Sequence, residues 1–149
     1  IKDIGMGTEI TYPSSWEIVL NIKPEGDYPI VLSKYVFTLS KGTNKLTLSK
    51  IMGGVGDVGE GLSSSEYDFE DIGSNIVRYA KRGTTTWRYG EKANCSDMIG
   101  GGVGAENADI CIGHFFPGFG SHQYATTASV ETSDESILPE VDAIVLSAK

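Results

Sequence analysis

Apolar and polar residues alternate along much of this chain, and that pattern constrains the fold more than any other feature of the sequence. Between residues 16 and 22 most of the apolar side chains occupy every second position, directly after the break formed by Pro13, Ser14 and Ser15. Alternation with a period of two is typical of a strand with one buried face. The pattern therefore predicts a sheet protein, with loops at residues 13–15 and 24–27.

Pairs of these segments are separated by short turns, which predicts antiparallel hairpins. The pairs are residues 35–40 with 45–51, residues 75–81 with 84–89, and residues 109–116 with 122–130. In the first hairpin we expect Leu46 and Leu48 to share a face with Phe37 and Leu39. Residues 52–74 are rich in Gly, Ser and acidic residues, and they predict a long excursion with at most one helical turn near residues 65–69.

The end of the chain has a different period. Apolar residues recur at helical spacing from Ile137 to Ala148, and the capping residue types Ser133, Asp134 and Ser136 stand just upstream. Pro139 suits the first turn of a helix, where its missing N–H is harmless. Strands in hairpins followed by one helix predict a single α+β domain over residues 1–149: a mostly antiparallel, twisted sheet covered by a C-terminal amphipathic helix.

Charge limits the partners. The formal net charge of −8 disfavours nucleic acid, whose phosphates this average field repels. The densest basic group, Arg78, Lys81, Arg82 and Arg88, is interpreted as a solvated face of two adjacent strands. No apolar run is long enough for a transmembrane helix. The chain begins at Ile1, so we expect either a removed leader or a trimmed sequence, and an N-terminal anchor before it stays possible.

Cys95 and Cys111 are the only cysteines, and they flank a Gly-rich segment. A disulfide bridge between them would stabilise the fold by about 3 kcal/mol, because it restricts a flexible loop in the unfolded chain. The alternatives are two buried free thiols, a zinc site, for which the ligand spacing is wrong, and a catalytic thiol, for which no local signature exists. The disulfide predicts an oxidising, extracytoplasmic location: periplasmic, cell-surface or secreted.

Both ends of the chain resemble PsbP-like domains. The N-terminal segment Ile10-Thr-Tyr-Pro-Ser-Ser-Trp16 resembles the opening of that family, and residues 137–146 resemble its last helix. The resemblance implies an extracytoplasmic α/β domain, often carried by exported or lipid-anchored bacterial proteins, with no conserved catalysis. The Gly-rich stretches 52–61 and 99–104 and the cysteine pair depart from the family pattern, and no functional residue is carried over.

Three motifs could carry chemistry. Gly54, Gly56 and Gly59 match G-x-G-x-x-G, but no helix pattern follows them, so we expect a flexible loop and no cofactor. The acidic group Asp57, Glu60, Glu66, Asp68, Glu70 and Asp71 lacks calcium-loop spacing and is interpreted as a solvated loop. His114 and His122 stand across a predicted hairpin, where they are weak candidates for a metal site.

Aromatic residues indicate a contact surface. Phe115, Phe116 and Phe119 surround the Pro117-Gly118 turn, which is more apolar surface than a turn needs. They either fold into the core or form a patch for a partner. The sequence therefore predicts a non-enzymatic extracytoplasmic or cell-surface domain for protein binding or surface assembly. The alternatives are a subunit of an extracellular filament or coat, and a metal-dependent enzyme that uses His114 and His122.

Overall fold

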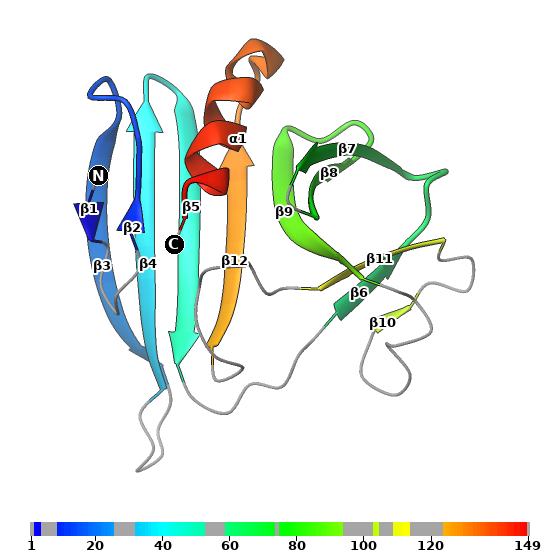
Figure 1. The fold of residues 1–149 in the computed structure, drawn as a ribbon, viewed down its shortest axis with the longest axis horizontal. Coiled ribbons are helices and arrows are strands. Elements are labelled where there is room, and N and C mark those ends of the chain that lie inside the picture. The colour runs from blue at the N-terminus through cyan, green and yellow to red at the C-terminus, as the bar shows by residue number, and fades with distance from the viewer. Residues whose placement is uncertain are drawn as a thin grey trace.

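The computed structural model describes residues 2–3, 9–25, 32–52, 59–73, 75–93, 103–104, 109–113 and 124–148. The strands that it describes are β1 (Lys2–Asp3), β2 (Glu9–Ile10), β3 (Glu17–Glu25), β4 (Leu32–Lys41), β5 (Asn44–Met52), β6 (Gly59–Leu62), β7 (Tyr67–Gly73), β8 (Ile76–Lys81), β9 (Thr86–Ala93), β10 (Val103–Gly104), β11 (Ile110–Gly113) and β12 (Tyr124–Glu131). A 3₁₀ turn, η2 (Glu135–Ile137), leads into the helix α1 (Leu138–Leu146). The fold is thus mostly antiparallel sheet with one helix at its C-terminal end (Figure 1).

Strands β3, β4, β5 and β12 lie side by side, and together with α1 they form what we call the covered sheet (Figure 1). The predicted hairpin of β4 and β5 is confirmed: Phe37 lies opposite Leu48 and Leu39 opposite Leu46. All four side chains are buried on one face. Alternation therefore placed this core correctly, because residues that lie opposite each other in a ladder share a face.

Helix α1 packs on that face and closes the main core. Its buried residues Leu138, Val141, Ile144 and Val145 pack with the sheet side chains. Pro139 lies in the first turn as predicted, and the Asp134 side chain accepts a hydrogen bond from the Ser136 N–H at 3.0 Å. Trp16 is buried in the same core, and its Nε1 donates to Glu140 Oε1 at 2.9 Å. This hydrogen bond thus joins the N-terminal segment to the C-terminal helix over the same face of the sheet.

Strand β9 connects the covered sheet to the rest of the molecule. Its first half pairs with β12, its second half pairs with β11, and β8 lies along its other edge. Gly90 stands where the partner changes. A Cβ added there would come within 2.1 Å of Ile112 Cγ2, so only glycine lets β11 approach this closely. Figure 1 shows that β9 bends along its length.

Beyond β9 the sheet curls, and we call strands β6–β11 the rolled end (Figure 1). Strands β7, β8 and β9 follow one another by antiparallel pairing, while β11 pairs with β6, and β6 pairs in parallel with β10. The rolled end encloses a second core, whose described buried residues are Leu62, Val77, Tyr79 and Ile112. Strand β8 is consequently buried on both faces: Ile76 belongs to the main core and Tyr79 to the second.

Two sequence predictions about secondary structure were wrong. Residues 52–74 include two strands, β6 and β7, and the chain around residues 65–69 is a turn followed by a strand, without a helix. Acidic residues on the exposed positions of β7 had hidden the alternation of Tyr67 and Phe69. The loop predicted at residues 24–27 was wrong for Pro24, which lies within β3. Strand β3 pairs only with β4 among the described strands, and such an edge strand tolerates proline.

Within the described part of the chain, no helix is long and apolar enough to cross a membrane.

Candidate functional site

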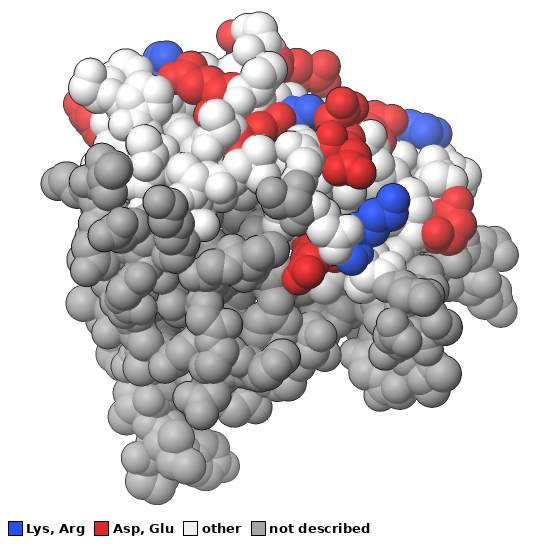
Figure 2. All heavy atoms as spheres, viewed as in Figure 1, with Lys and Arg blue, Asp and Glu red and all other residues white. Residues whose placement is uncertain are grey.

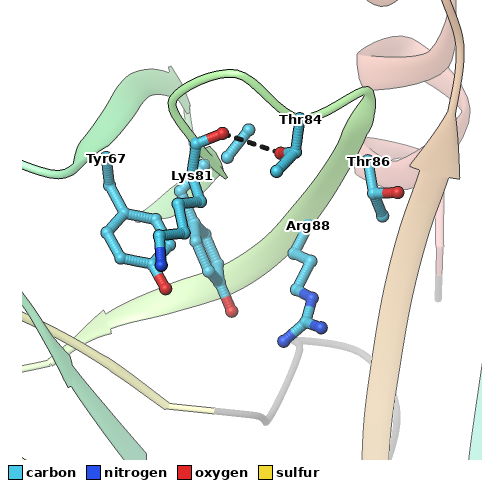
Figure 3. Close-up of a pocket in the computed structure, with 7 residues that line it drawn as sticks. Tyr67, Lys81, Thr84, Thr86 and Arg88 are labelled. Carbon is cyan, nitrogen blue, oxygen red and sulfur yellow. Dashed lines mark hydrogen bonds between the residues drawn. The ribbon is translucent and has the colours of Figure 1, made fainter.

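A cavity of about 320 Å³ opens at the upper end of the rolled end, beside the turn between β8 and β9. We call it the mouth pocket. Figure 3 shows side chains from three neighbouring segments turned toward it. Its lining includes Tyr67, Tyr79, Lys81, Thr84, Thr86 and Arg88. The site therefore combines two aromatic rings, two cations and two hydroxyl groups.

Strand register explains why these residues meet. Tyr67 of β7 lies opposite Lys81 of β8, and Tyr79 of β8 lies opposite Arg88 of β9. Residues two apart on a strand also share a face, so Lys81 and Tyr79 point the same way. All of them lie on the face of the sheet that does not carry α1, which we call the open face. The pocket is thus a direct product of pairing across three strands.

Aromatic packing forms the floor of the mouth pocket. The ring centroids of Tyr67 and Tyr79 are 6.4 Å apart and tilted by 55°. Phe69 stacks on Tyr79 at 6.2 Å with an interplanar angle of 24°. Tyr79 is only 2% exposed and belongs to the second core. The floor is therefore held by packing, and its rings have little freedom to turn.

Arg82 clamps the wall of the pocket, although its side chain is exposed. Its guanidinium donates to Ser65 O at 2.7 Å and to Ser64 O at 3.1 Å, and its Nε donates to Asp68 Oδ1 at 3.1 Å. Its backbone N–H donates to Glu66 O at 3.0 Å. These bonds tie the turn before β7 to the turn after β8. Such a frame holds binding groups in place before a ligand arrives.

Two further bonds anchor the same wall to Asp109, the residue before β11. The Asp109 carboxylate accepts hydrogen bonds from the backbone N–H and the hydroxyl of Ser64. Those two bonds, the side-chain bond first, hold the pKa of Asp109 below its ordinary value. Thr84 completes the rim: its Oγ1 donates to Lys81 O at 2.7 Å, the bond drawn in Figure 3.

The cations of the pocket differ from three other basic residues that the structure describes. Lys41, Arg78 and Arg82 each form an ion pair, with Glu140, Asp142 and Asp68. Neither Lys81 nor Arg88 forms an ion pair with a described residue, and both are exposed. Figure 2 shows acidic side chains gathered over the upper part of the face that carries α1. The mouth pocket is therefore a local cationic site on an acidic chain.

A second polar group lies on the other face of β8, against α1. Tyr89 donates a hydrogen bond to Asp142 Oδ1 at 2.7 Å, and Arg78 Nη1 lies 3.5 Å from Asp142 Oδ2. The Arg78 guanidinium also lies 5.0 Å from the ring centre of Trp87. Burial raises the pKa of Asp142, and burial with the Asp142 carboxylate raises the pKa of Tyr89. This group joins α1 to the rolled end, and we call it the latch.

The structure divides the basic cluster that the sequence predicted as one solvated face. Lys81 and Arg88 line the mouth pocket, Arg82 clamps its wall, and Arg78 is only 9% exposed and belongs to the latch. The solvated interpretation was therefore wrong for Arg78. The signal that could have separated them is alternation: Val77, Tyr79 and Lys81 share one face of β8, and Arg78 points to the other.

Several predicted site residues lie outside the described residues: Cys95, His114, Phe115, Phe116, Phe119 and His122. Their roles stay predictions. Cys111 is buried on β11 and carries no free thiol, but its predicted partner Cys95 is not described, so the pairing of the two stays a prediction. Among the described residues, no three His, Cys, Asp or Glu side chains are grouped as metal ligands would be.

Comparisons with protein-family models, curated proteins and solved structures gave no match.

Proposed function

We propose that this chain is a non-enzymatic binding domain of an extracytoplasmic or cell-surface protein, and that it holds a partner protein at the mouth pocket. The observation that carries the proposal is the pair of cations, Lys81 and Arg88, beside two tyrosines in a preformed cavity. Tyrosine and arginine are enriched where protein interfaces gain most of their affinity. A PsbP-like fold remains part of this proposal.

Binding accounts for the pocket better than catalysis does. The described residues that line it include no carboxylate, histidine or cysteine. A hydrolytic site needs a nucleophile and a base within hydrogen-bond reach of each other, and an orienting group beside them. Two cations, the phenol of Tyr67 and two threonine hydroxyls instead suit the recognition of a polar ligand. The hydrogen bonds of Arg82, which hold the wall of the pocket in place, also favour binding, because a rigid site loses less entropy when a ligand binds.

A random peptide library displayed on phage tests the proposal. The library is selected on the wild-type protein and counter-selected on the variant Lys81→Ala/Arg88→Ala. We expect clones whose affinity falls at least about tenfold on that variant, since bonds to charged groups contribute about 1.5–3 kcal/mol. Lys45→Ala is the matched control, because Lys45 is an exposed cation on the open face outside the pocket. Clones that bind all three proteins equally would contradict the proposal.

Self-assembly is a second candidate function, and one observation favours it. Strand β3 pairs only with β4 among the described strands, and Val19 on it is 54% exposed. An edge strand offers unpaired backbone groups to another chain. Sedimentation at several protein concentrations checks this: a filament or coat subunit grows in mass with concentration, whereas a strict monomer excludes assembly through this edge.

A further inference from the structure

We infer that the mouth pocket recognises a single carboxylate group of the partner, presented beside an aromatic or aliphatic side chain. This inference rests on the proposed function and specifies the chemistry of its ligand. It follows from four properties of the pocket: its size, the placement of its cations, the charge of the surrounding protein and the nature of its floor.

Size limits the ligand to a small group. A cavity of about 320 Å³ is at the lower end of the range for ligand sites, which runs from roughly 300 to 1,000 Å³. It accommodates one or two side chains of a partner. The remainder of the partner would have to lie on the rim, where Thr84 and Thr86 are exposed and offer hydroxyl groups for hydrogen bonds.

The placement of the cations suits one carboxylate held between them. Arg88 lies opposite Tyr79, and Lys81 follows Tyr79 by two residues on the same face. Diagonal neighbours of this kind are about 7–8 Å apart in a regular antiparallel pair. A carboxylate has two oxygens, so it can accept from the planar fork of Arg88 and from the ammonium group of Lys81 together. No described acid occupies that position.

The charge of the protein favours a single anionic group over a polyanion. The chain carries a formal net charge of −8, which repels a highly charged ligand at long range. Glu131 also lies opposite Thr86, one strand away from the rim. Two local cations can balance one carboxylate against this field, but they cannot balance the many charges of a nucleic acid or a sulfated polymer.

The floor favours an apolar group next to the carboxylate. Tyr67 is partly exposed and presents ring surface, which Phe69 and the buried ring of Tyr79 support from below. Aromatic pairs stabilise a contact beyond the area that they bury. A residue with a flat ring beside an acidic group would therefore use both parts of the pocket. Either a side-chain carboxylate or a C-terminal carboxylate can supply the acid.

The test is a nuclear magnetic resonance titration of the ¹⁵N-labelled protein with three synthetic dipeptides. Acetyl-Glu-Tyr-amide carries only a side-chain carboxylate, and acetyl-Gln-Tyr with a free C-terminus carries only a terminal one. Acetyl-Gln-Tyr-amide is the uncharged control. We expect shifts at the amides of Lys81, Thr84, Thr86 and Arg88, and at least about tenfold tighter binding of one charged peptide than of the control. The charged peptide that binds more tightly identifies the source of the carboxylate.

Variants decide whether the carboxylate meets the pocket cations. Arg88→Ala should remove the advantage of the charged peptide over the control, and Lys45→Ala should leave it unchanged. If all three peptides bind the mouth pocket equally, or none shifts its amides, the carboxylate inference is overturned. The peptide library result then decides the proposed function separately, because its selection does not require an acidic residue.

Discussion

The covered sheet and the rolled end meet where β12 pairs with β9, but they are built on different cores. The main core under α1 is large and apolar, and it includes Leu39, Leu46, Val130, Val141 and Ile144, all nearly or fully buried. Among the described residues, the second core has four buried members, and partly buried aromatic rings pack against them. The covered sheet is closed by a helix, whereas the rolled end opens at the mouth pocket.

This difference separates stability from recognition. Burial of apolar area is the dominant favourable term in folding, so most of the free energy of unfolding should come from the covered sheet. Binding sites are commonly drawn from parts of a molecule with fewer buried contacts. The described residues of the rolled end meet that description, yet Arg82 and Ser64 hold its wall by hydrogen bonds. Four substitutions test the comparison.

Ile144→Ala should have the largest effect. Ile144 is 1% exposed, and its side chain packs from α1 into the main core, so truncation leaves a cavity. We expect the free energy of unfolding to fall by about 2–5 kcal/mol in a urea titration. Leu146→Ala is the matched control on the same helix: Leu146 is 41% exposed, and its loss should stay within about 0.5 kcal/mol. Equal losses for the two variants would show that α1 does not close the main core.

Gly90→Ala should disturb the rolled end more than the covered sheet. The new Cβ would meet Ile112 Cγ2 at 2.1 Å and Gly113 O at 3.0 Å. Overpacking of this kind costs about 1–3 kcal/mol. Hydrogen exchange should become faster at β11 before it does so at β4 and β5. Adding Ile112→Ala removes the clashing methyl group, so the double variant should lose less than the sum of the single losses; strict additivity would contradict the contact.

Asp142→Asn tests the latch between the two regions. Asparagine can still accept the Tyr89 hydrogen bond, but Arg78 loses its counter-ion at a site where it is only 9% exposed. We expect a loss of roughly 1–3 kcal/mol, since an uncompensated charged group stays partly buried. Calorimetry would record it as a lower melting temperature.

The raised pKa of Asp142 gives this prediction a pH dependence. A carboxyl group with a higher pKa in the folded state binds its proton more tightly there, so it favours folding at pH values below its ordinary pKa. That contribution is lost as the pH rises through the folded pKa. The free energy of unfolding of the wild type should therefore fall relative to that of Asp142→Asn as the pH rises across this range. A constant difference would show that the carboxyl group does not titrate with folding.

Glu140→Gln should have the smallest effect, and one of opposite sign in pH. Hydrogen bonds from Trp16 and Lys41 hold the pKa of Glu140 below its ordinary value of 4.5. A lowered pKa contributes stability above that value, and the contribution disappears as the pH falls through the folded pKa. The variant should therefore show a flatter loss of stability on acidification, as followed by tryptophan fluorescence. An unchanged acid slope would place the titrating group elsewhere, for example at Asp109 or Asp134, whose pKa values are also lowered.

The sequence predicted the covered sheet better than the rolled end, for physical reasons. Phe37, Leu39, Leu46 and Leu48 alternate cleanly because only one face of β4 and β5 is buried. Strand β8 lacks such alternation: residues from Ile76 to Ala80 are all buried because both faces of the strand are covered. A period-two pattern therefore cannot identify a strand that is buried on both faces.

The candidate site was only partly predictable. The basic cluster drew attention to the correct hairpin, but the roles of its members depend on which face each side chain takes. Tyr67 comes from a strand that the sequence had assigned to a loop, so its meeting with Lys81 could not be foreseen. Predictions for the histidines and phenylalanines of residues 114–122 fall on residues that the structure does not describe.

The position of β12 has a consequence for the order of assembly. This strand lies between β5 and β9, and it pairs along its whole length with β5. The ribosome synthesises β12 after both of its neighbours, so a nascent chain that has reached residue 123 contains β5 and β9 but lacks the strand that lies between them. Unpaired edges in such intermediates promote aggregation. The two hairpins that contain β5 and β9 are therefore joined only after β12 has been synthesised.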